Sequence, residues 1–127
     1  MYHVDIAYAG DYSFEVKSDN YKFSVDAKSL KGITPPDTLL ASLGTCIGVY
    51  MHKYAEGAKL DIKDFSISVD AELSQEKPVR FKDINVSVDL KGAQLDERRK
   101  KSLIEFIKNC PVHNTIEGTP AVEIAVH

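Results

Sequence analysis

The sequence predicts an α+β fold with the element order βββ-α-ββ-α-β and one buried central helix. Two observations support this class. Several segments alternate apolar and polar residues with the period of two that is typical of a β-strand. Two other segments have helical features, and the first carries almost no charge between Leu39 and Tyr50. Because a helix without a polar face is one that other elements surround, we expect this helix at the centre.

A three-stranded antiparallel meander is predicted at the start of the chain. The segments YHVDIAY, YSFEVK and YKFSVD alternate aromatic or β-branched residues with polar ones, and AGD and SDN lie between them as turns. In the third segment Tyr21, Phe23 and Val25 share one face, which we expect to be the buried face.

The first helix has recognisable ends. Thr34 is suited to the N-cap, Pro35 to the first helical position, and Asp37 to the third position of a capping-box variant. Gly57 is expected to end the helix.

The second half of the chain predicts a long hairpin, a helix and a last strand. DIKDFSISVDAELS and VRFKDINVSVDL alternate over long spans and are joined by QEKP. The segment LDERRKKSLIEFIKNC has the apolar spacing of an amphipathic helix with a basic outer face. In TPAVEIAVH the residues Val122, Ile124 and Val126 alternate, which predicts a short strand.

Composition sets limits on the protein class. At 127 residues, with 43% hydrophobic and 28% charged residues, the chain is expected to form one domain over residues 1–127. Its formal charge of −3 argues against nucleic acid as the main partner. The start lacks the features of a signal peptide, and the apolar stretch 39–51 is too short to span a bilayer. We therefore expect a cytoplasmic protein with no membrane partner.

A homodimer is expected because one chain of this size has difficulty enclosing a helix on all sides. The meander covers one flank of the predicted central helix and the hairpin another. A second copy would complete the enclosure through a largely apolar interface.

The two cysteines are the candidate reactive groups. In a reducing compartment they are expected to be free thiols, a redox pair or metal ligands rather than a permanent disulfide. Two cysteines and four histidines in no tight ligand spacing give little support to a zinc site.

Cys46 lies inside the predicted central helix among apolar neighbours such as Leu43 and Ile47. Burial raises the pKa of a thiol, so an inert, structural Cys46 is one reading and a reactive one is the other.

Cys110 is followed by Pro111, which cannot continue the preceding helix but suits the first position of a new one. Cys110 would then be an N-cap, where free N–H groups and a protonated His113 favour a thiolate. The alternative is a turn that only closes the core. The two thiols are 64 positions apart, so only the fold can bring them together.

Three segments together resemble the OsmC/Ohr family of osmotically inducible and organic hydroperoxide resistance proteins. These are PPDTLLASLGTCIGVYM, NCPVHNTI about 60 residues later, and the closing PAVEIAV. The resemblance covers nearly the whole chain and implies an intertwined homodimer with buried central helices. It also implies a thiol-dependent peroxidase, an antioxidant enzyme of the oxidative stress response.

The resemblance assigns a role to each cysteine. Cys46 matches the peroxidatic cysteine, whose thiolate attacks an organic hydroperoxide and becomes a sulfenic acid. Cys110 matches the resolving cysteine, which condenses with that sulfenic acid to a disulfide. A dithiol reductant, such as a lipoylated protein, then restores both thiols. No metal or other cofactor is implied.

One feature of the peroxidase branch is missing. That branch uses an arginine from the N-terminal region, held by a glutamate at the start of the central helix, to stabilise the thiolate. This chain has no arginine before Arg80. Asp37 falls where the glutamate is expected, but nine helical positions place it about 13 Å along the axis from Cys46, which favours a capping role.

Other cations are therefore candidates for stabilising the thiolate. They are Lys28 or Lys31 just before the helix, His113, and Arg80 at the start of the second long strand. A cation in an apolar pocket can lower the pKa of a thiol by about one pH unit or more.

The substrate implied is a hydrophobic organic hydroperoxide. The expected apolar lining consists of Leu39, Leu43, Val49 and Phe106. Two alternatives remain. One is a dimer of the same fold that acts as a thiol redox sensor or binds a small apolar ligand, because fold does not decide chemistry. The other is a structural domain with inert cysteines.

Overall fold

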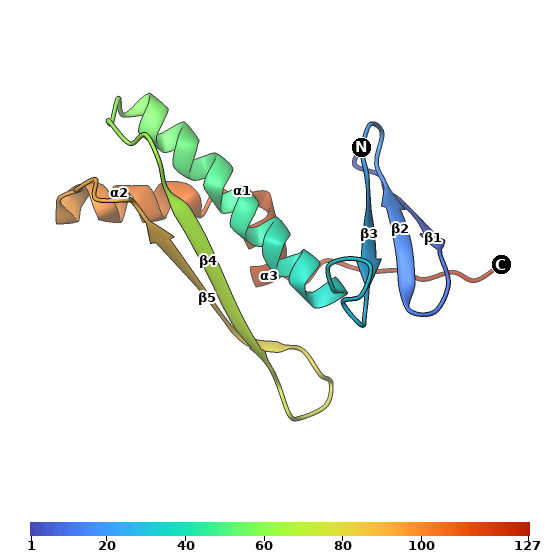
Figure 1. Ribbon diagram of the computed structural model, residues 1–127. Helices are drawn as coiled ribbons and strands as arrows, with labels where there is room; N and C mark the ends of the chain where they lie inside the picture. The colour runs from blue at the N-terminus through green and yellow to red at the C-terminus, as the bar shows by residue number, and fades with distance from the viewer. The chain divides into compact units, whose positions relative to one another are not determined.

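The computed structural model describes residues 1–127 and has the mixed α and β content predicted. The chain forms two compact units, Met1–Ala41 and Ser42–His127. That residues 1–127 make one domain stays a prediction. In chain order the elements are β1 (Asp5–Tyr8), β2 (Ser13–Lys17), β3 (Lys22–Asp26), α1 (Pro35–Gly57), β4 (Ser66–Leu73), β5 (Phe81–Asp89), α2 (Glu97–Ile107) and α3 (Pro111–Glu117) (Figure 1).

The N-terminal unit contains the predicted antiparallel meander in the order β1-β2-β3. Its register pairs Tyr8 with Phe14 and Phe14 with Val25. Residues paired directly across an antiparallel sheet point to the same face, so the apolar side chains gather on one side. That face carries Ile6, Tyr8, Phe14, Val16, Phe23 and Val25.

The predicted burial of this face is wrong for most of its residues in the single chain. Val25 is buried, but Phe23 is 47% exposed and Tyr21 79% exposed. Ile6 and Tyr8 are exposed as well. A three-stranded sheet offers these side chains nothing to pack against except one another, so the apolar face remains open.

The loop after β3 is held by Asp26, a buried carboxylate. Asp26 accepts hydrogen bonds from the backbone N–H of Lys28 at 2.8 Å and of Lys31 at 3.0 Å. Val25 forms a parallel bridge with Ile33, which leads the chain to the start of α1.

Helix α1 begins as predicted. The Asp37 N–H donates to Thr34 Oγ1 at 3.2 Å, and the Thr34 hydroxyl donates to Asp37 Oδ2 at 2.8 Å. This reciprocal arrangement satisfies one of the free N–H groups of the first turn. The helix ends at Gly57, also as predicted.

Within the C-terminal unit α1 lies along the hairpin β4–β5 (Figure 1). A Cβ atom built on Gly44 would lie 3.0 Å from Val69 Cγ2, and one built on Gly48 would lie 3.4 Å from Ile67 Cδ1. The absence of a side chain at these two positions therefore lets the helix approach β4 closely.

Helix α1 is not buried on all sides in the single chain. Its buried residues are Leu43, Gly44, Ile47, Met51 and Ala55, which recur at helical spacing along one side. Val49 is 51% exposed. The prediction of a surrounded helix therefore holds for one side only, since the chain has no second layer to cover the other.

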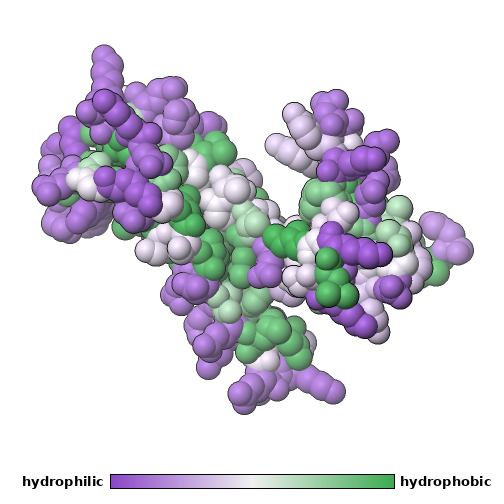
Figure 2. Space-filling view, viewed as in Figure 1, coloured by the Kyte–Doolittle hydropathy of each residue, from purple (hydrophilic) through white to green (hydrophobic).

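Strands β4 and β5 form the predicted antiparallel hairpin, with Ser66 paired to Asp89 and a register shift between Glu72 and Leu73. Alternate residues contribute to the core, including Ile67, Val69 and Ile84. Leu73 and Val79, near the turn, are more than half exposed. Figure 2 shows a hydrophobic patch at this end of the hairpin.

The end of the chain differs from the prediction. The break at Pro111 and the short helix that follows it are present as α3. The last strand is absent, because residues 121–127 have no strand partner. Val122, Ile124 and Val126 are each more than three-quarters exposed. An isolated strand leaves its backbone groups unpaired, so the alternating pattern alone does not produce one.

Candidate active site

The two sulfurs meet in the core of the C-terminal unit. Leu43, Ile47 and Cys110 form its buried centre, and Cys46 packs against them. Cys110 is completely buried, whereas Cys46 is half-buried, and both thiols are free. The remaining neighbours come from α1, β4, β5, α2 and α3, and they are Tyr50, Ile67, Val69, Ile84, Ile107, Val112 and Ile116.

Cys46 packs beside Cys110 and Val112 in this cluster. The pKa of Cys46 is raised, first by burial and then by its hydrogen bond with Cys110. The Val112 hydrogen bond lowers the pKa, the charge of ionised Cys110 raises it, and the positive charge of Lys53 lowers it. The opposing effects leave the thiol favoured over the thiolate.

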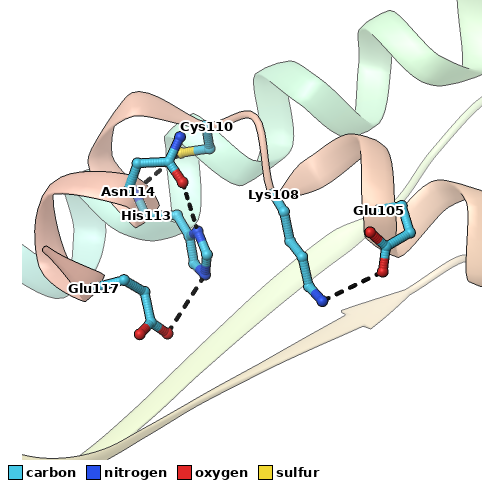
Figure 3. A network of polar contacts seen from close by, with 6 residues as sticks. All are labelled: Glu105, Lys108, Cys110, His113, Asn114 and Glu117. Atoms are coloured by element: carbon cyan, nitrogen blue, oxygen red, sulfur yellow. Dashed lines mark hydrogen bonds and ion pairs between the residues drawn. The ribbon is translucent and has the colours of Figure 1, made fainter.

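Cys110 is the N-cap of α3, as the sequence predicts. Its sulfur accepts a hydrogen bond from the His113 N–H at 3.4 Å. The cap arises because Pro111 occupies the first helical position and Cys110 retains extended backbone angles, with φ −59° and ψ 121°. Figure 3 shows the sulfur at the start of the helix, facing the turn that contains Asn114.

The His113 ring interacts with its own helix. Nδ1 lies 3.3 Å from Asn114 Oδ1, and Nε2 lies 3.7 Å from Glu117 Oε1 (Figure 3). Its backbone, not its ring, contacts the Cys110 sulfur. A role for the His113 ring in stabilising the Cys46 thiolate stays a prediction.

The other predicted polar residues are placed away from the sulfurs or within the N-terminal unit. The Arg80 N–H donates to Ser74 Oγ at 3.1 Å, in the turn of the hairpin. The Lys31 N–H is bonded to Asp26, and Asp37 caps α1. The ionised groups that affect the pKa of Cys46 are Cys110 and Lys53.

Two of the four predicted pocket residues each line a cavity of the C-terminal unit. Leu43 lines a cavity of about 360 Å³ in the C-terminal unit, whereas Phe106 lines a different one with Tyr54. Val49 is exposed, and Leu39 is 44% exposed. Their joint role as a substrate pocket stays a prediction.

The cavity that contains Leu43 is mostly apolar and adjoins the sulfur cluster, with which it shares Leu43, Ile47, Ile84, Ile107 and Ile116. Its polar residues are Lys108, His113 and Glu117. The apolar remainder comes from the inner face of β5 and from helices, and consists of Leu43, Ile47, Ile84, Val86, Val88, Ile104, Ile107 and Ile116.

Two contributors were missed by the sequence reasoning. Val112 acts through its backbone, so its residue type gives no signal. The position of Lys53 was predictable from its spacing. Lys53 follows Cys46 by seven positions, and residues seven apart lie on the same side of a helix, two turns from each other.

No group of three or more His, Cys, Asp or Glu side chains is placed to hold a metal ion. No helix combines the length and apolar character needed to cross a bilayer. What the arrangement offers chemically is a pair of neighbouring free thiols in an apolar setting, which a two-electron oxidation can join as a disulfide.

A comparison with protein families identifies the family of this chain. The profile of the OsmC-like proteins matches residues 26–125. The chain belongs to the OsmC-like family. The family resemblance seen in the sequence is thereby confirmed.

Individual OsmC-like relatives match over most of this chain. A protein of Mycoplasma pneumoniae named hydroperoxide reductase is 26% identical over 124 residues, which are 92% of this chain and 87% of the relative. The crystal structure of an OsmC-like protein from Mycoplasma pneumoniae has a TM-score of 0.80 at 24% identity, covering 94% of this chain and 89% of that one. The organic hydroperoxide resistance protein OhrB of Bacillus subtilis has a TM-score of 0.67 at 18% identity, covering 94% and 92%. These two structures establish the OsmC fold.

The reactivity of Cys46 is expected to rise with pH. Because its pKa is raised, the thiolate fraction at pH 7 is small, and the rate of alkylation by iodoacetamide should increase up to a midpoint above the ordinary thiol value of about 8.5. In Cys110→Ser the midpoint should fall, because Cys110 raises the pKa of Cys46 both by its hydrogen bond and by its charge. Mass spectrometry of the labelled Cys46 peptide measures the rate, and a midpoint below that of free cysteine would contradict this assignment.

Proposed function

We propose that this protein is a thiol-dependent peroxidase that reduces organic hydroperoxides. The observation that carries the proposal is the contact between Cys46 and Cys110, two free thiols 64 positions apart in the sequence. The names of the Mycoplasma pneumoniae and Bacillus subtilis relatives support a substrate of this class.

The proposed reaction has two steps and then a reduction. The Cys46 thiolate attacks one oxygen of the peroxide bond, the O–O bond breaks, and the alkoxide takes up a proton and leaves as an alcohol, so that Cys46 becomes a sulfenic acid. The Cys110 thiolate attacks that sulfur and forms a disulfide, the S–O bond breaks, and the hydroxide released takes up a proton to become water. An external dithiol then exchanges with the disulfide and returns both cysteines to thiols.

The surroundings of the sulfurs fit this sequence. The contact between Cys46 and Cys110 supports the resolving role proposed for Cys110, and the interaction with the Val112 backbone favours the Cys46 thiolate. The apolar cavity next to the cluster favours an organic peroxide over hydrogen peroxide, since burying apolar surface contributes about 25 cal/mol per Å².

We also propose that the working form is an intertwined homodimer. The apolar face of β1–β3, the uncovered side of α1 and the unpaired residues 121–127 all expose apolar side chains. Exposed apolar surface of this extent is typical of an interface. Sedimentation equilibrium tests the dimer, and a single species of 14.1 kDa at micromolar concentration would contradict it.

The reaction requires both cysteines to be reduced at rest, so we propose a cytoplasmic location and a dithiol reductant, for which a lipoylated protein is suited. A dithiol that closes a ring on oxidation reduces a disulfide without leaving a mixed disulfide behind.

The test of the proposed function is a turnover assay. Purified wild-type protein with dihydrolipoamide should consume cumene hydroperoxide and t-butyl hydroperoxide faster than hydrogen peroxide at equal concentration, because only the organic peroxides gain from the apolar cavity. Peroxide loss measured with xylenol orange gives the rates. Equal rates for all three peroxides would contradict the substrate class, and rates no higher than with free cysteine would contradict the peroxidase.

A second candidate function is a thiol redox sensor or a binding module for a small apolar ligand. The raised pKa of Cys46 disfavours rapid turnover, whereas the pair of free thiols can still form a disulfide and the apolar cavity can still bind a small apolar ligand. Formation of the disulfide without repeated turnover in the presence of dihydrolipoamide would favour this candidate.

A further inference from the structure

Lys53 lies on the same side of α1 as Cys46. The seven positions between them correspond to about 10.5 Å along the axis and about 20° short of two full turns. Side chains of a helix are tilted toward its N-terminus, so the Lys53 side chain extends from its own turn back toward the turn of Cys46.

An aromatic ring fixes the ammonium group of Lys53. Lys53 Nζ lies 4.8 Å from the centre of the Tyr50 ring, and Tyr50 is one turn after Cys46 and packs against the same cluster. The ring is itself held by Phe106, at a centroid distance of 5.9 Å and an interplanar angle of 52°. A cation–π contact at an exposed site contributes about 0.5–1 kcal/mol, which keeps the charge on this side of the helix.

The other titratable groups around the thiols have different partners or the opposite effect. On α3, Cys110 raises the pKa of Cys46, and the His113 ring lies beside the Glu117 carboxylate. Lys108, after α2, is paired with Glu105 at 3.4 Å (Figure 3). Strands β4 and β5 face the cluster with apolar side chains, namely Ile67, Val69 and Ile84.

We infer that Lys53, held over the Tyr50 ring, is the positively charged residue that stabilises the Cys46 thiolate in this chain. No arginine precedes α1, so Lys53 supplies the positive charge from within the helix. Lys53 acts through space and does not touch the reacting atoms, so it is a supporting and not a catalytic residue. This role rests on the reactive thiol of the proposed function, but it concerns only how readily that thiol ionises.

The test compares charge variants in a Cys110→Ser background, where Cys46 is the one remaining thiol. The measured quantity is the midpoint of the pH profile for alkylation of Cys46 by iodoacetamide. Lys53→Met should raise the midpoint by about half a unit, the size expected for one exposed charge at this range. Lys53→Arg should keep the midpoint of the parent, because it retains the charge and stacks on an aromatic ring.

Two controls separate charge from structure. Lys63→Met removes an exposed lysine that precedes β4 and should leave the midpoint unchanged. In 1 M NaCl the difference between Lys53→Met and the parent should shrink, because the Debye length falls to about 3 Å.

An unchanged midpoint in Lys53→Met, or the same upward shift in Lys53→Arg, would overturn the inference. Either result would leave the peroxidase reaction untouched, because this experiment contains no peroxide. Conversely, absence of peroxide turnover in the wild type would refute the proposed function while the midpoint shift still reported the Lys53–Cys46 interaction.

Discussion

Cys46→Ser is expected to lose peroxide turnover by at least about a hundredfold, since a serine hydroxyl at neutral pH is neither ionised nor easily oxidised. Cys46 is half-buried, so a serine of similar size should be accommodated. Turnover with cumene hydroperoxide and dihydrolipoamide measures the loss. Circular dichroism and the unfolding midpoint confirm that the variant is folded.

Cys110→Ser is the matched control for this prediction. It removes the other sulfur of the pair and keeps Cys46, so the first step should proceed and stop at the sulfenic acid, which dimedone traps as an adduct. Dimedone labelling of Cys46 in Cys110→Ser, with none in Cys46→Ser, would support the two roles. Equal loss of the first step in both variants would contradict the division of roles.

Gly44→Val is expected to destabilise the C-terminal unit by about 3 kcal/mol. A Cβ atom alone would already lie 3.0 Å from Val69 Cγ2, and valine adds two methyl groups at a buried contact between α1 and β4. The helix must move away from the strand or Val69 must leave its rotamer. Urea unfolding should show a lower midpoint with an unchanged slope.

Gly57→Val is the matched control for Gly44→Val, because it places the same side chain on the same helix. A Cβ atom at Gly57 would have no atom within 4 Å. Its effect should stay within about 1 kcal/mol, since replacing glycine at a helix end changes only local conformational preference. Similar losses of stability in the two variants would show that the close contact between Gly44 and Val69 does not cause the destabilisation.

The parts of the fold that local chemistry determines were predicted well. The Thr34 cap, the end of α1 at Gly57 and the break at Pro111 each depend on residues within a few positions, and all three are present. The last strand was predicted from alternation alone and is absent. A strand needs a neighbouring edge to pair with, and the sequence of the segment does not say whether the same chain supplies one.

The candidate site was predictable only in part, for the same reason. Cys110 could be assigned as an N-cap from Pro111, but its contact with Cys46 depends on how α3 packs in the C-terminal unit. The family resemblance implies the pairing, whereas the residue pattern alone does not. Lys53 was overlooked because its effect depends on the orientation of the Tyr50 ring, which is set by packing against Phe106.

The central claim is that Cys46 and Cys110 act as one redox pair, and intact-mass spectrometry tests it most directly. Reduced protein treated with one equivalent of cumene hydroperoxide, without reductant, should lose two hydrogen atoms in mass. Its proteolytic digest should contain a peptide joining Cys46 to Cys110 within one chain. An unchanged mass with the peroxide still present, or a protein that gains oxygen while both cysteine peptides stay separate, would contradict the claim.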